Sequence, residues 1–278
     1  MLDNLLPIDP EVAARVEALD LQFNKFGVDP FGIDKDELTR SVSAFAWIYR
    51  FYFKVDVYGL ENVPSRGRAV LIGNHSGGVA IDAMMVMGSM LLDASPPRLP
   101  HGMIDKFIHE FPGASQFMAR TGQFTGKPDQ AKRLLRAERL LLVFPEGARG
   151  TAKLAKDADS LVDFGTGFMR LALETKTPIV PFAFVGGGEA LPTVANLRRL
   201  GRLFGVPYIP VTKWGVLIPK PTRFQLLYGK PMMFEGSGHE RDEVVHGMVA
   251  QVKERIRDLI QQGRALREKK ISEEDLVL

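Results

Sequence analysis

Three short, uninterrupted apolar runs constrain the fold of this 278-residue chain more than any other feature of its sequence. They cover residues 69–72, 140–144 and 178–185, and each leads into a turn that contains glycine. Runs of this length between turn residues are typical of strands buried on both faces. We expect helices over 10–22, 35–53, 81–92, 107–119, 129–136, 164–174 and 240–262. Strands that alternate with helices predict an α/β protein with a mixed, largely parallel sheet flanked by helices.

The length suits one α/β domain preceded by helices. Residues 1–53 are expected to form an N-terminal helical region, and the aromatic-rich half of that region is a candidate for membrane association. Residues 54–262 are expected to form the α/β domain. Residues 263–278 are expected to form a charged, frayed C-terminal tail.

Composition excludes several classes of function. The chain has no cysteine, so it has no disulfide, no cysteine nucleophile and no thiolate metal site. Its net charge of +3 is too mild to indicate a nucleic acid, and no such partner is expected. The N-terminus lacks the pattern of a signal peptide, and no run of about 18 uncharged apolar residues occurs. We expect a peripheral or monotopic protein on the cytoplasmic side of a membrane.

Basic residues gather in two zones of the chain. Residues 120–156 hold nine bases and three acids, and residues 196–223 hold six bases and no acid. In the second zone leucines and aromatic residues alternate with the bases, a composition that suits contact with a membrane surface. The alternative is that the apolar residues pack beneath a loop while the bases are only solvated.

The first motif, from Gly73 to Asp82, follows the buried strand 69–72. His75 stands directly after that strand, where α/β sheets bind ligands, and an imidazole there can act as a general base. Asp82 can orient the ring, while Gly77 and Gly78 can offer backbone N–H groups to an oxyanion. The alternative is a structural histidine whose hydrogen bonds are satisfied within the protein.

The second motif, Phe-Pro-Glu-Gly-Ala-Arg, spans 144–149 and follows the second buried strand. Glu146, Gly147 and Arg149 can build a polar site there, and the guanidinium group of Arg149 can clamp a phosphate. Read alone, the motif is equally consistent with an ordinary turn that carries a surface ion pair.

Other catalytic templates are absent from the sequence. It contains neither a P-loop nor a Gly-x-Ser-x-Gly nucleophile turn. The remaining histidines lack the spacing of metal ligands, so we expect no metal and no bound cofactor. These are His101, His109, His239 and His246.

Together the two motifs resemble those of the phospholipid/glycerol acyltransferase family, the PlsC-like lysophospholipid acyltransferases. The order and spacing of the block at 144–147 carry most of the resemblance, which covers residues 55–232. Six residues separate His75 from Asp82 instead of the usual four, as in a variant with a longer loop. Lys127 stands where the family's acceptor block usually ends in arginine.

The resemblance implies direct transfer of an acyl group from acyl-CoA or acyl-carrier protein to a hydroxyl of a lysophospholipid-type lipid, as in a 1-acylglycerol-3-phosphate acyltransferase. His75 would be the general base and Asp82 would orient it. Backbone N–H groups at Gly77, Gly78 and Gly147 are candidates for the oxyanion site. The acceptor would contact Glu146, Arg149 and Lys127.

Two alternatives stay open at this point. The same chemistry could act on a neutral glyceride, an amino-acid lipid or a glycolipid, because Lys127 departs from the usual acceptor block. The altered spacing between His75 and Asp82 also allows a non-catalytic lipid-binding member of the fold.

Overall fold

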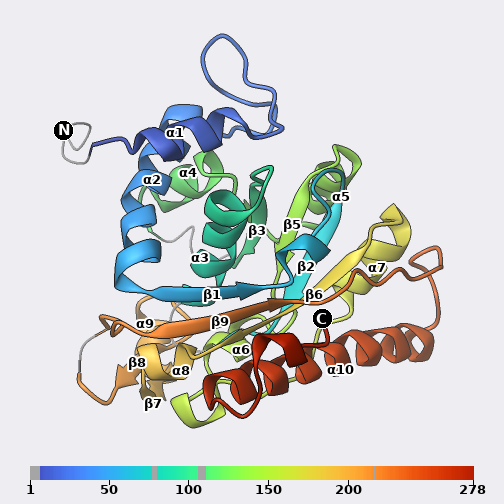
Figure 1. The fold of residues 1–278 in the computed structure, drawn as a ribbon. Coiled ribbons are helices and arrows are strands. Elements are labelled where there is room, and N and C mark those ends of the chain that lie inside the picture. Colours follow the sequence, from blue (N-terminus) through green and yellow to red (C-terminus); the bar gives the residue numbers. More distant parts are fainter. Residues whose placement is uncertain (1–6, 77–79, 106–110, 216) are drawn as a thin grey trace.

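A computed structural model describes residues 7–76, 80–105, 111–215 and 217–278. Seven strands form one sheet in the order β1-β9-β6-β2-β5-β3-β4 (Figure 1). The five strands from β6 to β4 are parallel, β9 is antiparallel to β6, and β1 is parallel to β9. The predicted mixed, largely parallel α/β sheet is therefore confirmed. The strands are β1 (Lys54–Tyr58), β2 (Ala69–Gly73), β3 (Pro100–Ile104), β4 (Phe124–Thr125), β5 (Leu140–Val143), β6 (Ile179–Val185) and β9 (Arg223–Tyr228).

The hydrophobic core lies in two layers, one on each face of the sheet. Successive side chains of a strand point to opposite faces, so Ala69 and Leu71 enter one layer while Val70 and Ile72 enter the other. The first layer is covered by α1 (Pro10–Glu17), α2 (Lys35–Trp47) and α3 (Ile81–Gly88). The second layer is covered by α5 (Pro128–Arg136), α7 (Gly167–Thr175) and α10 (Asp242–Arg267).

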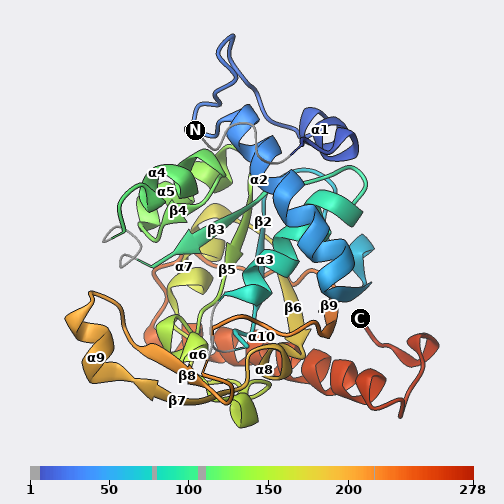
Figure 2. The ribbon, with the colours of Figure 1, turned by 90° about the vertical axis from the view of Figure 1, so that its left-hand side faces the viewer.

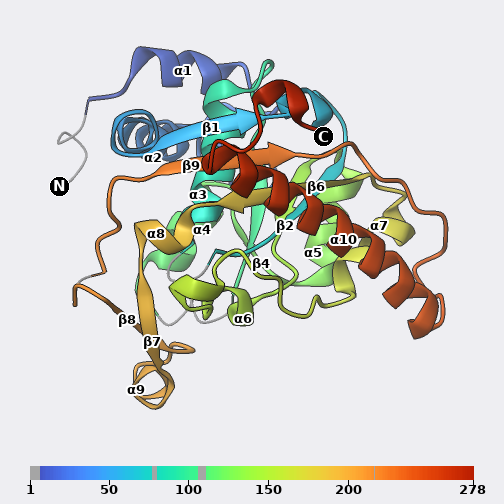
Figure 3. The same ribbon diagram turned by 60° about the horizontal axis from the view of Figure 1, so that its bottom comes forward.

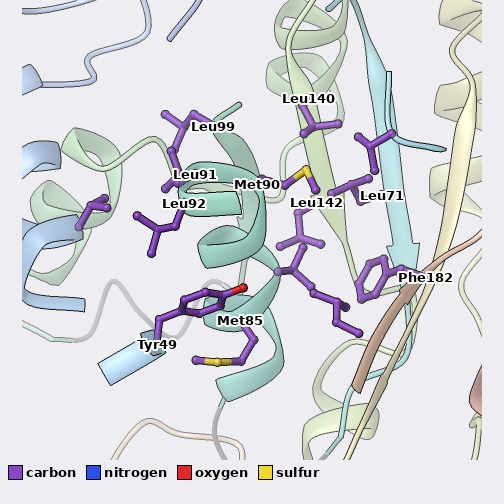
Figure 4. Close-up of a cluster of buried hydrophobic side chains, with 14 of the residues drawn as sticks. Tyr49, Leu71, Met85, Met90, Leu91, Leu92, Leu99, Leu140, Leu142 and Phe182 are labelled. Carbon is purple, nitrogen blue, oxygen red and sulfur yellow. The ribbon is translucent and has the colours of Figure 1, made fainter. Parts of the chain in front are cut away.

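Figure 4 shows part of the first layer, where strand residues meet the wide helical turn that follows α3. Leu71, Leu140 and Leu142 project from the sheet toward Met90, while Leu91 lies beside Leu99. All five side chains are buried, and each contributes on the order of 1.5–3 kcal/mol to folding. This packing fixes the start of α3, and with it Asp82, relative to the end of β2.

The N-terminal helices share the core of the sheet. Val12 of α1 and Leu38 of α2 belong to the same hydrophobic cluster as β2 and β5. Asp9 caps α1 through the backbone N–H of Glu11, at 2.8 Å, and its own N–H donates to Ser43 of α2. The predicted helix over 35–53 ends as an α-helix at residue 47 and continues as a wide turn to residue 52.

The C-terminal segment differs from the frayed tail expected from its charge. The helix α10 continues to Arg267, and the chain then turns back along it. Leu276 and Leu278 pack against the second core layer, while Gln262 accepts a hydrogen bond from the backbone N–H of Val277 at 2.7 Å. Burial of these two leucines outweighs the charge of the preceding residues.

An excursion between β6 and β9 was not expected as a structured unit. It holds α8 (Gly187–Ala190), β7 (Thr193–Leu197), α9 (Arg198–Leu203) and β8 (Ile209–Thr212), with β7 and β8 paired antiparallel. We call residues 193–215 and 217–220 the basic hairpin. Figure 3 shows it extending away from the body of the sheet. The short helices α4 (Ala114–Arg120) and α6 (Ala148–Thr151) complete the fold. Within the described ranges, no helix is long and apolar enough to cross a membrane.

Candidate active site

The two sequence motifs meet at the carboxyl edge of the sheet. β2 and β5 are neighbouring parallel strands, so the residues after them, His75 and Glu146, emerge side by side. The side chain of Asn74 holds this edge in place, because its amide accepts from the backbone N–H of Phe184 at 2.8 Å and donates to the carbonyl of Phe184 at 2.9 Å. Ligands of open α/β sheets bind at this edge.

His75 and Asp82 contact each other despite the six residues between them. Nδ1 of His75 lies 3.0 Å from Oδ2 of Asp82, a hydrogen-bond distance. The same carboxylate oxygen accepts from the backbone N–H of Ser76 at 2.7 Å and from its hydroxyl at 3.1 Å. The other oxygen accepts from the backbone N–H of Ala83 at 2.7 Å. These bonds fix both the carboxylate and the imidazole that it contacts.

The carboxyl group of Asp82 is ionised in this setting. Its burial by itself would raise the pKa, but the electrostatic interaction with His75 and hydrogen bonds from His75, Ser76 and Ala83 outweigh that effect and lower the pKa below its usual range. A carboxylate that stays charged can hold the Nδ1 proton of His75 and can stabilise an imidazolium ion.

A stacked aromatic ring also holds the imidazole of His75, in addition to the hydrogen bond at Nδ1. It stacks on the ring of Phe144 with centroids 3.9 Å apart and planes inclined by 12°. A Cβ on Gly150 would come within 2.7 Å of Cβ of His75, so that position has no room for a side chain. The His75 side chain keeps 11% of its surface exposed, and Nε2 makes no hydrogen bond to any residue that the structure describes. Nε2 is thus the atom available to a substrate.

The carboxylate of Glu146 is buried inside the site, whereas the family resemblance implies that it contacts the acceptor. It is only 2% exposed. Its Oε1 accepts from the backbone N–H of His75 at 2.9 Å, and its Oε2 accepts from the backbone N–H of Val162 at 3.1 Å. Nζ of Lys153 lies 3.0 Å from Oε2 and also donates to the carbonyl of Ser160 at 2.7 Å. The carboxylate therefore ties the ends of β2 and β5 to the segment 153–162.

The other predicted site residues are more dispersed. The backbone N–H of Gly147 donates to the carbonyl of Phe144 at 3.0 Å, within the turn that follows β5. Arg149 is exposed and donates through Nη2 to the carbonyl of Asp163 at 3.1 Å. Gly77 and Gly78 lie outside the described residues.

Lys127 lies on the same edge of the sheet as His75, three strand spacings away. It is exposed and precedes α5 at the end of β4, on the same carboxyl edge. Two strands, β5 and β3, stand between β4 and β2. At about 4.8 Å per strand this separates Lys127 from His75 by about 14 Å across the sheet.

Two residues near the site, Lys153 and Tyr208, were not identified from the sequence. Lys153 is buried beside Glu146, which it follows across the short helix α6. Tyr208 comes from the basic hairpin. Burial raises the pKa of its hydroxyl, a hydrogen bond with Thr151 opposes that shift, and the negative charge of Asp82 adds to it. The hydrogen bond places Tyr208 beside Thr151, at the end of α6. No local sequence signal could have found either residue.

Comparison with known proteins agrees with this geometry. Residues 54–185 match the family model described as Acyltransferase. Residues 54–185 therefore belong to the acyltransferase family. The resemblance inferred from the two motifs is thus confirmed, and the matched segment contains His75, Asp82 and Glu146.

Individual relatives extend this acyltransferase comparison. An uncharacterized protein of Mycobacterium leprae is 33% identical over 215 residues, covering 74% of this chain and 59% of the relative. The DGAT1/2-independent enzyme synthesizing storage lipids of Gallus gallus is 24% identical over 191 residues, covering 67% of this chain and 54% of that protein. This chain spans less than two thirds of the length of either relative.

The fold also matches a solved acyltransferase structure. It is the crystal structure of the 1-acyl-sn-glycerophosphate (LPA) acyltransferase, PlsC, from Thermotoga maritima, with a TM-score of 0.55 at 18% identity. The match covers 83% of this chain and 79% of that one. At this identity the likeness establishes the shared α/β fold.

Proposed function

We propose that this chain is a lipid acyltransferase in which His75 is the general base. The observation that carries the proposal is the 3.0 Å contact between Nδ1 of His75 and the ionised carboxylate of Asp82, with Nε2 left available at the carboxyl edge of the sheet. A general base must present a free nitrogen to the proton that it removes, in a ring of fixed orientation. This arrangement argues against a non-catalytic lipid-binding protein.

In the proposed reaction, Nε2 of His75 takes the proton of an acceptor hydroxyl while that oxygen attacks the carbonyl carbon of an acyl thioester. The tetrahedral intermediate collapses, the carbon–sulfur bond breaks, and the imidazolium returns its proton to the thiolate. The products are an ester and a thiol, and no acyl-enzyme forms. General-base assistance of this kind contributes about 10²–10⁴ in rate.

Donor and acceptor follow from the family resemblance and the relatives. The donor we propose is acyl-CoA or acyl-carrier protein, with no further cofactor. The first acceptor we propose is a lysophospholipid-type lipid on the cytoplasmic face of a membrane. Support comes from the fold shared with the Thermotoga glycerophosphate enzyme and from Arg149, an exposed residue of α6, which follows the turn after β5.

A neutral acceptor such as a glyceride is the second candidate, and a specific observation favours it. The Gallus gallus relative is named for synthesizing storage lipids, and lipids of that kind usually lack a charged head group. Lys127 also stands where the family's acceptor block usually ends in arginine, and lysine lacks the bidentate geometry that suits a phosphate.

Replacing His75 tests the catalytic part of the proposal. We expect His75→Ala to lower kcat by at least about 10²-fold, and Asp82→Asn to lower it strongly because the ring loses its orienting carboxylate. His101→Asn, which changes a buried histidine on β3, is the matched control and should keep kcat within about twofold. Near-native turnover by His75→Ala, measured as release of free thiol, would refute the mechanism.

A panel of acceptors distinguishes the two substrate classes. Purified enzyme with a radiolabelled acyl thioester would be offered lysophosphatidic acid, lysophosphatidylcholine, monoacylglycerol and diacylglycerol in matched detergent micelles. Preference for the phosphate-bearing acceptors supports the first candidate, and preference for the glycerides supports the second. Thioester hydrolysis with no transfer to any acceptor would contradict both.

A further inference from the structure

The basic hairpin exposes large apolar side chains that a water-soluble surface usually covers. Leu203 is 77% exposed, Phe204 63% and Ile218 71%. Gly201 lets α9 pack tightly on the hairpin, since a Cβ there would lie 2.5 Å from Cα of Tyr208. The leucine and phenylalanine at the end of α9 are therefore held outward by a well-packed unit.

Positive charge accompanies these apolar side chains. Arg198, Arg199 and Arg202 are exposed, and none forms an ion pair with a residue that the structure describes. The sixth base of this zone, Arg223, is different, because its guanidinium forms two bonds with the carboxylate of Asp56. Tertiary structure thus supplies an acid to Arg223 but, among the described residues, pairs none with the arginines of α9.

An aromatic side chain lies between two further bases. Nζ of Lys220 is 3.7 Å from the ring centroid of Trp214, and Nζ of Lys213 is 5.6 Å from it. Tryptophan beside lysine is a combination favoured at the level of lipid head groups, where the ring is partly buried and the ammonium stays hydrated.

The hairpin borders the candidate active site. Its Asn196 donates to the carbonyl of Ala152, just after α6, at 2.6 Å. Gly187 of α8, close before the hairpin, approaches Ser76 so closely that a Cβ would lie 2.2 Å from the hydroxyl oxygen. Figure 2 shows β7, β8 and α9 beside α6 and α8 at the same end of the molecule. A surface that contacts this hairpin therefore lies at the edge of the sheet that carries His75.

We propose that the basic hairpin is the surface on which this protein docks to an anionic lipid bilayer. The arginines of α9 contact the head groups, while Leu203, Phe204 and Ile218 insert at the boundary with the acyl chains. The proposal rests on the lipid acyltransferase function, since docking here brings membrane lipid to His75. An acidic protein would match the charge equally well, but it would not require three apolar side chains projecting among the bases.

Sedimentation with vesicles tests the docking directly. The probe is a set of vesicles of phosphatidylcholine with or without an equal share of phosphatidylglycerol, at low and at moderate salt. The test variant is Arg198→Glu with Arg199→Glu and Arg202→Glu. At about fivefold per base near an anionic surface, we expect the partition coefficient to fall by at least about 100-fold. Leu203→Ser with Phe204→Ser should weaken binding at both salt concentrations.

The matched control carries the same charge change at the opposite edge of the sheet. Arg66, Lys176 and Lys230 are exposed there, before β2, before β6 and after β9. Their replacement by glutamate should leave the partition coefficient within about threefold of the wild type. The thermal unfolding midpoint of each variant confirms that it is folded.

Activity measurements separate this proposal from the proposed function. The α9 variant should lose activity on acceptor in anionic vesicles and keep it on a short-chain, water-soluble acceptor. Failure of the wild type to bind anionic vesicles, or equal binding by the α9 and control variants, would overturn the docking surface. The α9 variant could instead lose activity on the soluble acceptor when the donor is an acyl-carrier protein and keep it when the donor is acyl-CoA. That result would overturn the docking surface in favour of an acidic protein partner. Turnover of the soluble acceptor by the wild type tests the proposed enzyme function separately, because that measurement does not depend on vesicle binding.

Discussion

The buried ion pair between Glu146 and Lys153 gives the sharpest test of how this site is held together. Side-chain exposures are 0% for the glutamate and 3% for the lysine. Lys153→Met keeps a long apolar stem but removes the ammonium, leaving the carboxylate with only the N–H groups of His75 and Val162 as hydrogen-bond partners. Removing one member of a buried ion pair costs about 3–5 kcal/mol.

That energy is large enough to measure in two ways. For a protein of this size 1 kcal/mol corresponds to roughly 2–4 °C in Tm, so we expect Lys153→Met to unfold about 6–20 °C lower. Urea denaturation should show the same loss in the free energy of unfolding. Because Glu146 anchors the backbone of His75, kcat should fall as well at temperatures where the variant is folded.

A double variant identifies the cause. Glu146→Gln with Lys153→Met removes both charges and keeps an amide oxygen for the N–H of His75, so it should be more stable than Lys153→Met alone. Lys156→Met is the matched control: it lies three residues away on the same segment, is exposed, and should change stability by less than about 0.5 kcal/mol. A loss below about 1 kcal/mol in Lys153→Met, or a double variant no more stable than Lys153→Met, would refute the reasoning.

Two further predictions concern pH and acceptor binding. Burial lowers the pKa of His101 to about 4 from 6.5, so between pH 6.5 and 4 the unfolded chain binds a proton that the folded chain does not. The free energy of unfolding should therefore fall as pH falls through that window, by about 3 kcal/mol more in the wild type than in His101→Asn. An equal dependence of the unfolding free energy on pH in the two proteins, measured by urea denaturation, would contradict this. Arg149→Lys should raise KM for phosphate-bearing acceptors and leave KM for glycerides unchanged, because lysine keeps the charge but loses the bidentate geometry. An unchanged KM for lysophosphatidic acid in an active variant would favour the neutral acceptor.

The sequence by itself determined the buried central strands and the edge at which the site lies. Uninterrupted apolar runs specify buried strands because both faces of such strands are covered, and residues that follow neighbouring parallel strands must meet at one edge. The sequence therefore places His75 and Glu146 after buried strands, and the pairing of β2 with β5 in the structure brings them side by side. The family resemblance could also be detected from the sequence, because residues 144–147 of its main motif are contiguous in the chain.

Tertiary structure alone decided which groups touch across the loops. The six residues between His75 and Asp82 could close or separate the pair, and it is packing of the segment after α3 on β2 and β5 that brings Asp82 to hydrogen-bond distance. Lys153 as the partner of Glu146, and Asp56 as the partner of Arg223, join residues with no periodic relation in sequence. Such contacts depend on how separate elements fit together in three dimensions, which neither local propensity nor charge pattern encodes.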